Sequence, residues 1–330
     1  MSEIRKDPIV NRWIIIATDR KNRPNDFSVY EENEDLKYCP FCEGNEKMTT
    51  PEITAVRKPD SAPNSAGWDL RVIPNKFPAL RVENELKKSK TGIYESISAT
   101  GAHELIIESP DHKKDLGQFS EEKIHSILTN IKNRISDLRN DIRLQHIIVF
   151  KNVGPKAGAT LKHPHFQLIA MPVIPKRAME TLTGAHDYFK IHKKCVFCDI
   201  IRQETEVGAR IVDSNNEFLS FCPYASRFPF ETWIIPKNHA ADFDCGEETH
   251  LRYLSRIMKN TLNKLHKALR DFQYNLLIHT SPLQSDFSES FHWHIEIFPR
   301  IVKTAGFEWG TGFFINSTPP EEAAKFLREI

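Results

Sequence analysis

Residues 163–170 read HPHFQLIA, and residues 292–299 read HWHIEIFP. Each stretch places two histidines two positions apart, directly before an apolar run that is typical of a strand. Side chains two positions apart in a strand lie on the same face, so each stretch presents two imidazoles together. Because a motif that recurs late in a chain indicates a duplication, we looked for the same order of elements before each copy.

The elements before the two motifs do recur in the same order. Each half begins with a CxxC pair, followed by an apolar run that ends in a histidine. Apolar residues at helical spacing then predict one long helix over residues 124–138 and another over 251–269, with Ser120 as the N-cap of the first. A strand is predicted next in each half, over 146–152 and 275–281. The chain therefore resembles a duplicated module.

This repeat predicts an α+β fold with an antiparallel sheet and a long helix in each half. We expect an N-terminal domain over residues 1–176 and a C-terminal domain over 190–330, joined by a segment near 175–194. One face of the sheet should pack on the helix, and the other should contact a partner surface.

Composition limits the classes of function. The 330 residues are 40% hydrophobic and carry a net charge of only +1, so nothing in the charge predicts nucleic-acid binding. No apolar run is long enough to span a membrane, and the first residues lack the apolar core of a signal peptide. We expect a cytoplasmic protein whose six cysteines do not form a disulfide framework.

The paired cysteines and distant histidines predict two metal sites per chain. Tetrahedral zinc takes four nitrogen or sulfur ligands, and a CxxC turn brings two thiolates to one ion. A redox role for CxxC is the alternative, but it requires a strand and helix context that is missing here and leaves the histidines unexplained. Iron in one site is compatible with the same ligands. The first predicted set is Cys39, Cys42, His112 and His163, and the second is Cys195, Cys198, His239 and His292. His294 is the alternative to His292.

If His163 holds a metal, His165 is available for chemistry. A neutral imidazole is a competent nucleophile near pH 7, and the amide of Gln167 can donate toward a charged oxygen. The preceding loop, residues 152–160, contains glycines whose backbone N–H groups could surround a phosphate. These features predict attack on a phosphoryl centre. In the second half Glu296 replaces the glutamine and would repel phosphate, so that half is expected to be structural or to add substrate contacts.

The chain resembles the galactose-1-phosphate uridylyltransferase family of the histidine triad superfamily along nearly its whole length. The motifs that carry this resemblance are RKDPIVNRWIIIA (5–17), RKNRP (20–24), CPFC (39–42), RVIPNKFPAL (71–80), IIESPDH (106–112), VFKNVGPKAGAT (149–160), HPHFQ (163–167) and GFEWGTGFFIN (306–316).

The resemblance implies tandem histidine-triad-like domains, a homodimer and a ping-pong reaction. His165 would attack UDP-glucose, release glucose 1-phosphate and pass the uridylyl group to galactose 1-phosphate. It also implies that Gln167 contacts the transferred phosphoryl group. The substrate-binding residues that it implies are Arg20 and Arg23 and Asn75 near the nucleotide, Asn152, Gly158, Ala159 and Thr160 at the phosphates, and Glu308 at the sugar.

Three departures from the familiar bacterial pattern keep a second activity open. Lys76 stands where that pattern has aspartate, Phe307 stands where it has tyrosine, and the second metal site has a cysteine pair. GFEWGTG and the second CxxC are closer to relatives that act as ADP-glucose phosphorylases, whereas Pro164 between the histidines is typical of uridylyltransferases. A zinc-stabilised binding module without catalysis is the non-enzymatic alternative.

Overall fold

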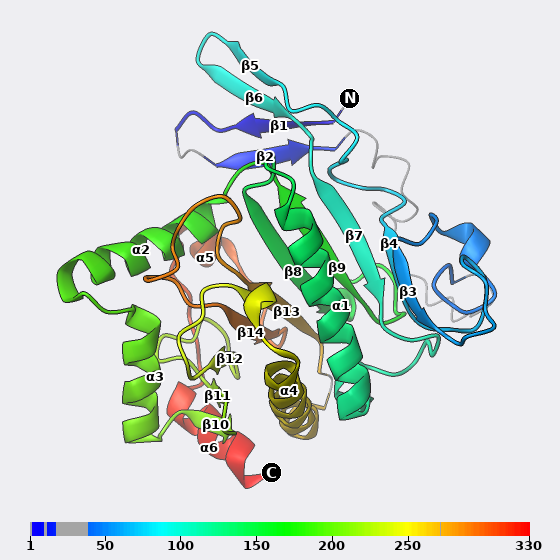
Figure 1. Cartoon of the computed structure of the whole chain (residues 1–330). Coiled ribbons are helices and arrows are strands. Elements are labelled where there is room, and N and C mark those ends of the chain that lie inside the picture. Colours follow the sequence, from blue (N-terminus) through cyan, green and yellow to red (C-terminus); the bar gives the residue numbers. More distant parts are fainter. Residues whose placement is uncertain (1, 10–11, 18–38, 271) are drawn as a thin grey trace.

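A single antiparallel sheet of ten strands organises the computed structural model, which describes residues 2–9, 12–17, 39–270 and 272–330 (Figure 1). In order across the sheet the strands are β10 (Ile211–Ser214), β11 (Phe218–Phe221), β12 (Thr232–Pro236), β14 (His294–Pro299), β13 (Tyr274–His279), β8 (His146–Val153), β9 (His165–Met171), β7 (Ala102–Ile107), β4 (Trp68–Pro74) and β3 (Thr54–Arg57). The first five belong to the C-terminal half, and the last five belong to the N-terminal half.

The two halves meet at an antiparallel pairing of β8 with β13, in which Val149 faces Ile278. The repeat that relates Ile148 to Leu277 also relates Val149 to Ile278, so each strand pairs with its own counterpart. A local two-fold axis therefore passes between these strands. The prediction of an α+β fold with antiparallel strands and one long helix in each half is confirmed. The periodicity did not reveal that the two half-sheets join into one.

Two long helices, α1 (Glu121–Arg139) and α4 (Glu248–Ala268), lie side by side on one face of this sheet (Figure 1). Ser120 caps α1 as predicted, because its hydroxyl accepts a hydrogen bond from the N–H of Lys123. The apolar stripes of both helices are buried in one continuous core with residues of both halves. The segments predicted as helices and central strands are confirmed, except that Leu269 follows the end of α4 and that β13 ends at His279, two residues before the predicted end.

Smaller elements complete the chain. A separate four-stranded sheet lies beside the N-terminal half and contains β1 (Glu3–Lys6), β2 (Trp13–Ile16), β5 (Lys88–Thr91) and β6 (Tyr94–Ser98). The predicted join is occupied by α2 (Lys176–His192), which is followed by α3 (Val196–Val207). Near the C-terminal end of the chain are α5 (Gly306–Thr311) and α6 (Pro320–Glu329). Short 3-10 helices are η3 (Glu46–Met48), η4 (Leu116–Gln118), η5 (Pro155–Ala157) and η6 (Phe243–Cys245).

The sheet face opposite α1 and α4 carries the polar side chains. On β9, Phe166, Leu168 and Ala170 are buried in the helix-covered core, so His165 and Gln167 point to the other face. The same alternation places His294 and Glu296 of β14 on that face. Among the described helices, none is long and apolar enough to cross a membrane.

Candidate active site

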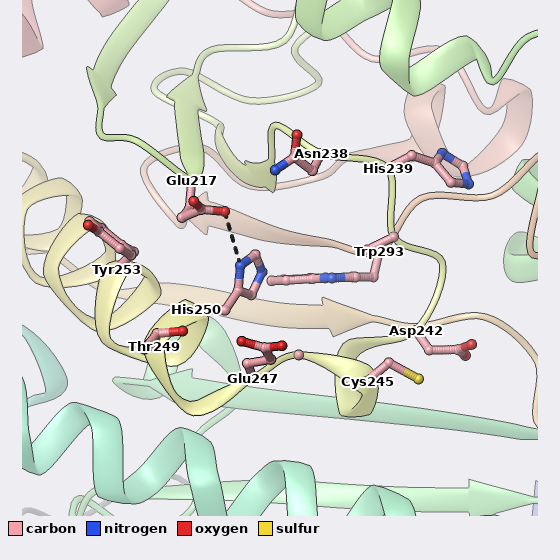
Figure 2. Close-up of a pocket in the computed structure, with 12 residues that line it drawn as sticks. Glu217, Asn238, His239, Asp242, Cys245, Glu247, Thr249, His250, Tyr253 and Trp293 are labelled. Carbon is pink, nitrogen blue, oxygen red and sulfur yellow. Dashed lines mark ion pairs between the residues drawn. The ribbon is translucent and has the colours of Figure 1, made fainter.

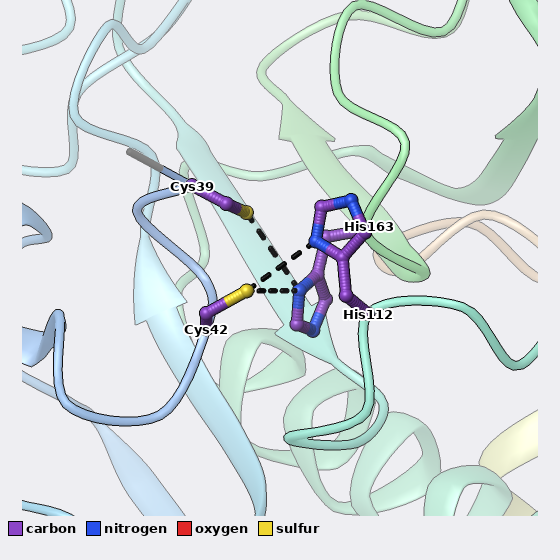
Figure 3. Close-up of side chains that lie close together, drawn as sticks. All are labelled: Cys39, Cys42, His112 and His163. Carbon is purple, nitrogen blue, oxygen red and sulfur yellow. Dashed lines mark hydrogen bonds between the residues drawn. The ribbon is translucent and has the colours of Figure 1, made fainter. Parts of the chain in front are cut away.

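The first predicted metal set lies together beside the N-terminal half of the sheet (Figure 3). The CxxC turn brings Cys39 and Cys42 to one side, and the histidines come from the loop after β7 and from the residues before β9. Cys42 Sγ is 3.3 Å from His112 Nδ1 and 3.6 Å from His163 Nδ1, and Cys39 Sγ is 3.7 Å from His163 Nδ1. All four ligand atoms lie within 4.8 Å of one another.

These separations fit a tetrahedral zinc site. Zinc–sulfur and zinc–nitrogen bonds of about 2.3 and 2.0 Å at tetrahedral angles place the ligand atoms about 3.6 Å apart. His163 Nε2 lies 2.7 Å from the carbonyl oxygen of Ser109, which requires a proton on Nε2 and leaves the Nδ1 lone pair turned toward the thiols. Burial lowers the pKa of His163 to about 4, so the ring is in the neutral form that ligates metals.

The second predicted set has the same geometry in the C-terminal half. Cys198 Sγ lies 3.3 Å from His239 Nδ1 and 3.7 Å from His292 Nδ1, and Cys195 belongs to the same group. His292 Nε2 lies 3.0 Å from the carbonyl oxygen of Pro236, as His163 does from Ser109. Of the two histidines that the sequence left open, His292 is therefore the one that faces the thiols.

His165 is held at the start of β9 by its own backbone. Its Nδ1 lies 2.8 Å from the carbonyl oxygen of His163, and that hydrogen bond requires the proton on Nδ1. The lone pair of the neutral ring is therefore on Nε2, which is the form that a nucleophile needs. The ring of Phe41, from within the first CxxC turn, contacts the rings of His163 and His165 edge-on at 6.0 and 5.2 Å. The first cluster and His165 are thus parts of one packed unit.

Gln167 lies on the same sheet face, and His103 of β7 binds its side chain. His103 Nε2 is 3.1 Å from Gln167 Oε1 and 3.1 Å from Asn75 Nδ2. Asn75 follows β4, and its backbone N–H donates to the carbonyl of His103. The structure therefore brings Asn75 and Gln167, two of the predicted site residues, to a single imidazole that the sequence analysis did not single out.

The loop after β8 carries the predicted phosphate-site residues. Two of their backbone N–H groups bind carbonyl oxygens of the loop itself, whereas the sequence analysis expected them to surround a phosphate. The N–H groups of Gly158 and Ala159 donate to the carbonyls of Pro155 and Gly154 within the loop. Asn275 of β13 fixes the loop from the other half, because its amide donates to Asn152 Oδ1 at 2.7 Å and to the Ala157 carbonyl at 2.8 Å. In this conformation the backbone N–H groups of residues 158 and 159 bind loop carbonyls, so the side chain of Asn152 is a better candidate for a phosphate contact.

The remaining predicted residues lie elsewhere or outside the description. Arg20 and Arg23 fall outside the described residues. Glu308 lies in α5, where its carboxylate accepts a hydrogen bond from the N–H of Ala305 at 3.0 Å. Its position near a sugar therefore remains a prediction. Thr160 lies three residues after the end of η5 and is half-buried.

Comparison with known families decides what this arrangement belongs to. The description "Galactose-1-phosphate uridyl transferase, N-terminal domain" matches residues 1–175, and that of the C-terminal domain matches residues 182–310. The chain belongs to this uridyl transferase family. The resemblance that the motifs indicated is therefore confirmed.

Relatives of this chain are named for two different enzyme activities. The chain is 39% identical to an ADP-glucose phosphorylase of Arabidopsis thaliana, over 99% of this chain and 93% of that protein. It is 28% identical to a galactose-1-phosphate uridylyltransferase of Thermotoga maritima, over 100% of this chain and 98% of that protein. Among solved structures, the Arabidopsis phosphorylase with bound ADP-glucose matches with a TM-score of 0.79 and 38% identity, covering 100% of this chain and 99% of that one. A uridylyltransferase matches with a TM-score of 0.83 and 26% identity, covering 99% and 98%.

The second half of this uridyl transferase chain has His294 at the position that corresponds to His165, but other side chains cover its ring. His294 Nδ1 lies 3.0 Å from the carbonyl oxygen of His292, as in the first half. Its ring is stacked between Trp233 and His279, with centroids 4.8 and 4.9 Å away. Glu296 stands where Gln167 stands in the first half, and its Oε1 is 3.9 Å from His294 Nε2. A phosphoryl group would meet a carboxylate here, which agrees with the predicted structural role of this half.

A cavity of about 300 Å³ lies between the N-terminal end of α4 and the end of β12 (Figure 2). Glu217, Asp242 and Glu247 line it with His250 and Trp293, and Glu217 forms an ion pair with His250 at 3.5 Å. Three carboxylates disfavour a nucleotide phosphate. We therefore do not assign this cavity to the transferase site of the family.

The sequence contains signals for two further features of the site, the phenylalanines within the CxxC pairs and His103. Phe41 and Phe197 occupy the same third position of the two CxxC pairs, and Phe197 packs on His294 at 5.3 Å as Phe41 packs on His165. Two-residue alternation back along β7 places His103 on the face that carries Gln167. Asn275 had no such signal, because its contact with the phosphate loop depends on the joining of the two halves.

Proposed function

We propose that the protein is a galactose-1-phosphate uridylyltransferase, which converts UDP-glucose and galactose 1-phosphate into glucose 1-phosphate and UDP-galactose. The observation that carries this proposal is the tautomer of His165, whose Nδ1 proton is held by the His163 carbonyl while the lone pair is on Nε2. Membership of the family and the HPHFQ motif support the same reaction.

The reaction has two steps with the same geometry. His165 Nε2 forms a bond to the α-phosphorus, and the bond from that phosphorus to the bridging oxygen breaks, so that glucose 1-phosphate leaves with the electron pair. A phosphate oxygen of galactose 1-phosphate then attacks the same phosphorus, and the bond to Nε2 breaks. Catalysis of such transfers consists mainly of alignment and charge stabilisation.

We assign the site residues accordingly. His165 is the nucleophile, and the amide N–H of Gln167 donates to the phosphoryl oxygens as charge develops. The side chains of Asn152 and Thr160 bind the phosphates. Gly158 and Ala159 in the same loop would add backbone contacts only if their N–H groups left the carbonyls of Pro155 and Gly154. Arg20, Arg23 and Asn75 bind the nucleotide, and Glu308 binds the sugar.

We further propose that each Cys2His2 cluster holds one structural zinc ion, with iron as an alternative in one of them. The donor sets and separations support this assignment. The metals would link the CxxC turns to the ends of the central strands, and no reaction step requires them. We also propose a cytoplasmic homodimer with domains over residues 1–176 and 190–330, which acts on nucleotide sugars and sugar 1-phosphates.

ADP-glucose phosphorolysis is the second candidate, and a specific observation favours it. The chain is 39% identical to the Arabidopsis phosphorylase, compared with 28% for the Thermotoga uridylyltransferase. This activity would use the same covalent histidine with an adenylyl group, and inorganic phosphate would replace the sugar phosphate as acceptor. Position 165 therefore has the same role in both candidates.

The test separates the covalent step from the choice of substrate. The protein is incubated without acceptor with UDP-glucose or ADP-glucose labelled at the α-phosphate, and acid-labile label bound to protein is measured. We expect labelling that His165→Gln abolishes and that His294→Gln, the matched change in the other half, does not. The labelled enzyme is then offered galactose 1-phosphate, inorganic phosphate or water. Discharge chiefly by galactose 1-phosphate from a uridylyl-enzyme supports the first candidate, and discharge by phosphate from an adenylyl-enzyme supports the second.

A further inference from the structure

His103 is a buried histidine next to the proposed reaction centre. It lies on β7 with 4% of its surface exposed, and β7 pairs with β9 so that Leu105 faces Gln167 and His103 faces Ile169. His103 is thus two residue pairs along the sheet from Gln167 and on the same face. A polar side chain buried at such a position requires hydrogen-bond partners.

Its partners fix which nitrogen carries the proton. The backbone N–H of Ala79 can only donate, and it lies 3.1 Å from His103 Nδ1. Nδ1 therefore carries the lone pair, and the proton of the neutral ring is on Nε2. The Nε2–H group donates to Gln167 Oε1 at 3.1 Å. Asn75 Nδ2 also lies 3.1 Å from Nε2, but it is itself a donor because Asn75 Oδ1 accepts from the N–H of Phe77, so in this tautomer it forms no hydrogen bond with the ring. Since the oxygen of this amide is engaged by the imidazole, its NH2 group is turned away from His103.

The orientation of this amide decides whether it helps or hinders the reaction. An NH2 group directed at the phosphoryl oxygens stabilises the negative charge that develops there, whereas the amide oxygen would repel it. The two orientations differ by a half-turn about one bond and have the same shape. A hydrogen-bond donor next to the amide oxygen selects between the two orientations, because it leaves the NH2 group facing the phosphoryl oxygens.

The second half of the chain offers an internal comparison. Glu231, directly before β12, is the counterpart of His103, because the pairing of β12 with β14 repeats that of β7 with β9. Glu296, the counterpart of Gln167, accepts from Arg227 at 3.0 Å, and Glu231 accepts from the same guanidinium at 2.9 Å. In both halves this position belongs to the group that fixes the side chain two residues after the second histidine. In the second half the donor to the carboxylate of Glu296 is the cation Arg227, which Glu231 also binds. In the first half the donor to the amide of Gln167 is the N–H of His103 itself.

We infer that His103 is a positioning residue, which holds the amide of Gln167 in the orientation that donates to the transferred phosphoryl group. The inference rests on the proposed function, because it assigns the orientation of a residue that acts in nucleotidyl transfer. His103 itself contacts no reacting atom in this assignment. It would serve either nucleotide, since it acts on the phosphoryl centre that uridylyl and adenylyl transfer share.

Two substitutions of His103 separate its two hydrogen bonds. The oxygen of His103→Asn can reach the place of Nδ1 and accept from Ala79, but the shorter side chain has no donor at the place of Nε2. The longer His103→Gln can place an N–H near Nε2 and donate to Gln167. We expect His103→Asn to reduce the single-turnover rate of His165 labelling by about tenfold or more, with little change in the half-saturating nucleotide-sugar concentration. His103→Gln should restore most of that rate.

A double-mutant cycle distinguishes positioning from a general loss of structure. In a Gln167→Ala background, His103→Asn should cause no further loss of labelling rate, because the amide that it orients is gone. Equal losses in both backgrounds, or a wild-type rate for His103→Asn, would overturn the inference. Thermal unfolding of each variant identifies losses that are due to instability. If the wild-type protein forms no label on His165 at all, the proposed function fails instead, so the two failures are distinguishable.

Discussion

The two histidines at equivalent positions, His165 and His294, differ in their surroundings and not in their backbone geometry. Each has Nδ1 close to the carbonyl of the histidine two residues before it. Burial lowers the pKa of His294 to about 3, and flat rings cover both of its faces. A phosphorus atom that approached this ring would also meet the carboxylate of Glu296. The environment therefore makes one of two identical groups a candidate nucleophile and the other a packed core residue.

This contrast predicts the outcome of a matched pair of substitutions. His294→Gln should leave the rate of nucleotidyl labelling within about twofold of the wild type, but it should lower the free energy of unfolding by about 1–3 kcal/mol because buried hydrogen bonds are lost. His165→Gln should abolish labelling. Labelling rates and urea unfolding measure both quantities. Loss of labelling in a folded His294→Gln protein would contradict the assignment of chemistry to the first half.

Sequence patterns could identify both histidine pairs because their two-residue spacing is local. They could not show which of the pairs is covered, since Trp233 and His279 reach His294 from other strands of the sheet. The same limit applies to His103, whose role depends on Ala79 and Gln167, each on a different segment. The sequence predicted which side chains lie together, but it did not predict how they are oriented.

On the helix-covered side of the N-terminal half of the sheet, a cluster of buried charged residues joins elements that are distant in sequence. Lys151 of β8 points to the helix-covered side, where its Nζ lies 2.5 Å from Glu108 Oε1 and 3.5 Å from Asp115 Oδ1. Asp115 also accepts from Tyr274 of β13 and lies 3.2 Å from His266 of α4. The group therefore connects the loop that carries His112 with both halves of the molecule.

The two carboxyl groups have opposite pKa shifts. Burial raises the pKa of Glu108 to about 7, against the lowering effect of Lys151. Burial also opposes ionisation of Asp115, but Lys151 and the hydrogen bonds from His266 and Tyr274 lower its pKa to about 2. Glu108 therefore contributes stability below pH 4 that is lost as the pH rises toward 7, and Asp115 contributes stability above pH 4 that is lost as the pH falls toward 2.

Replacing the shared cation should make stability strongly dependent on pH. Lys151→Met leaves two buried carboxyl groups without their counter-charge, which raises the pKa of Glu108 further above its unfolded value and raises the pKa of Asp115 from its lowered value. We expect a loss of about 3–5 kcal/mol in the free energy of unfolding at pH 8, and a clearly smaller loss at pH 5, where Glu108 retains its proton. Urea unfolding at the two pH values measures the difference.

The double variant Lys151→Met/Glu108→Gln is the control, because a neutral amide at position 108 removes most of the charge that the lysine offsets. It should be more stable than Lys151→Met at pH 8 and should show a weaker pH dependence. A loss from Lys151→Met that is equal at pH 5 and pH 8 would show that packing, and not charge, is what the lysine provides.

At the level of elements, the sequence predicted the helices and central strands because each has its own periodicity and caps. It predicted neither the pairing of β8 with β13 nor the small sheet of β1, β2, β5 and β6. Both depend on edge hydrogen bonds, which leave no periodic trace in either strand. The predicted border between domains falls on α2, and the sheet and the core continue across it.

Among the residues that the structure describes, one ten-stranded sheet and its main core thus run through both halves, with a Cys2His2 cluster in each half. Each cluster attaches a CxxC turn to the residues around its own histidine pair. Because α1, α4 and the central strands share a continuous core, a loss in either half should weaken the whole structure. The two clusters differ in what they support: the first packs through Phe41 on His165, and the second packs through Phe197 on His294.

Removing one ligand from each proposed metal centre tests this difference. Cys39→Ser and Cys195→Ser should each reduce the zinc content from two ions per chain to one, and each should lower the free energy of unfolding by about 3 kcal/mol or more. Only Cys39→Ser should also reduce labelling of His165, because it releases the turn that carries Phe41 and the ligand whose carbonyl holds the Nδ1 proton. Elemental analysis, unfolding and labelling measure the three quantities.

The shared core also predicts how many unfolding transitions the protein has. With a shared core, each single-cluster variant should still unfold in one transition, whether it is followed near Trp68 in the N-terminal half or near Trp293 in the C-terminal half. Two separate transitions would mean that the halves are independent domains in spite of the common sheet. Loss of labelling in a folded Cys195→Ser protein would mean that the second cluster reaches the reaction centre across the β8–β13 pairing.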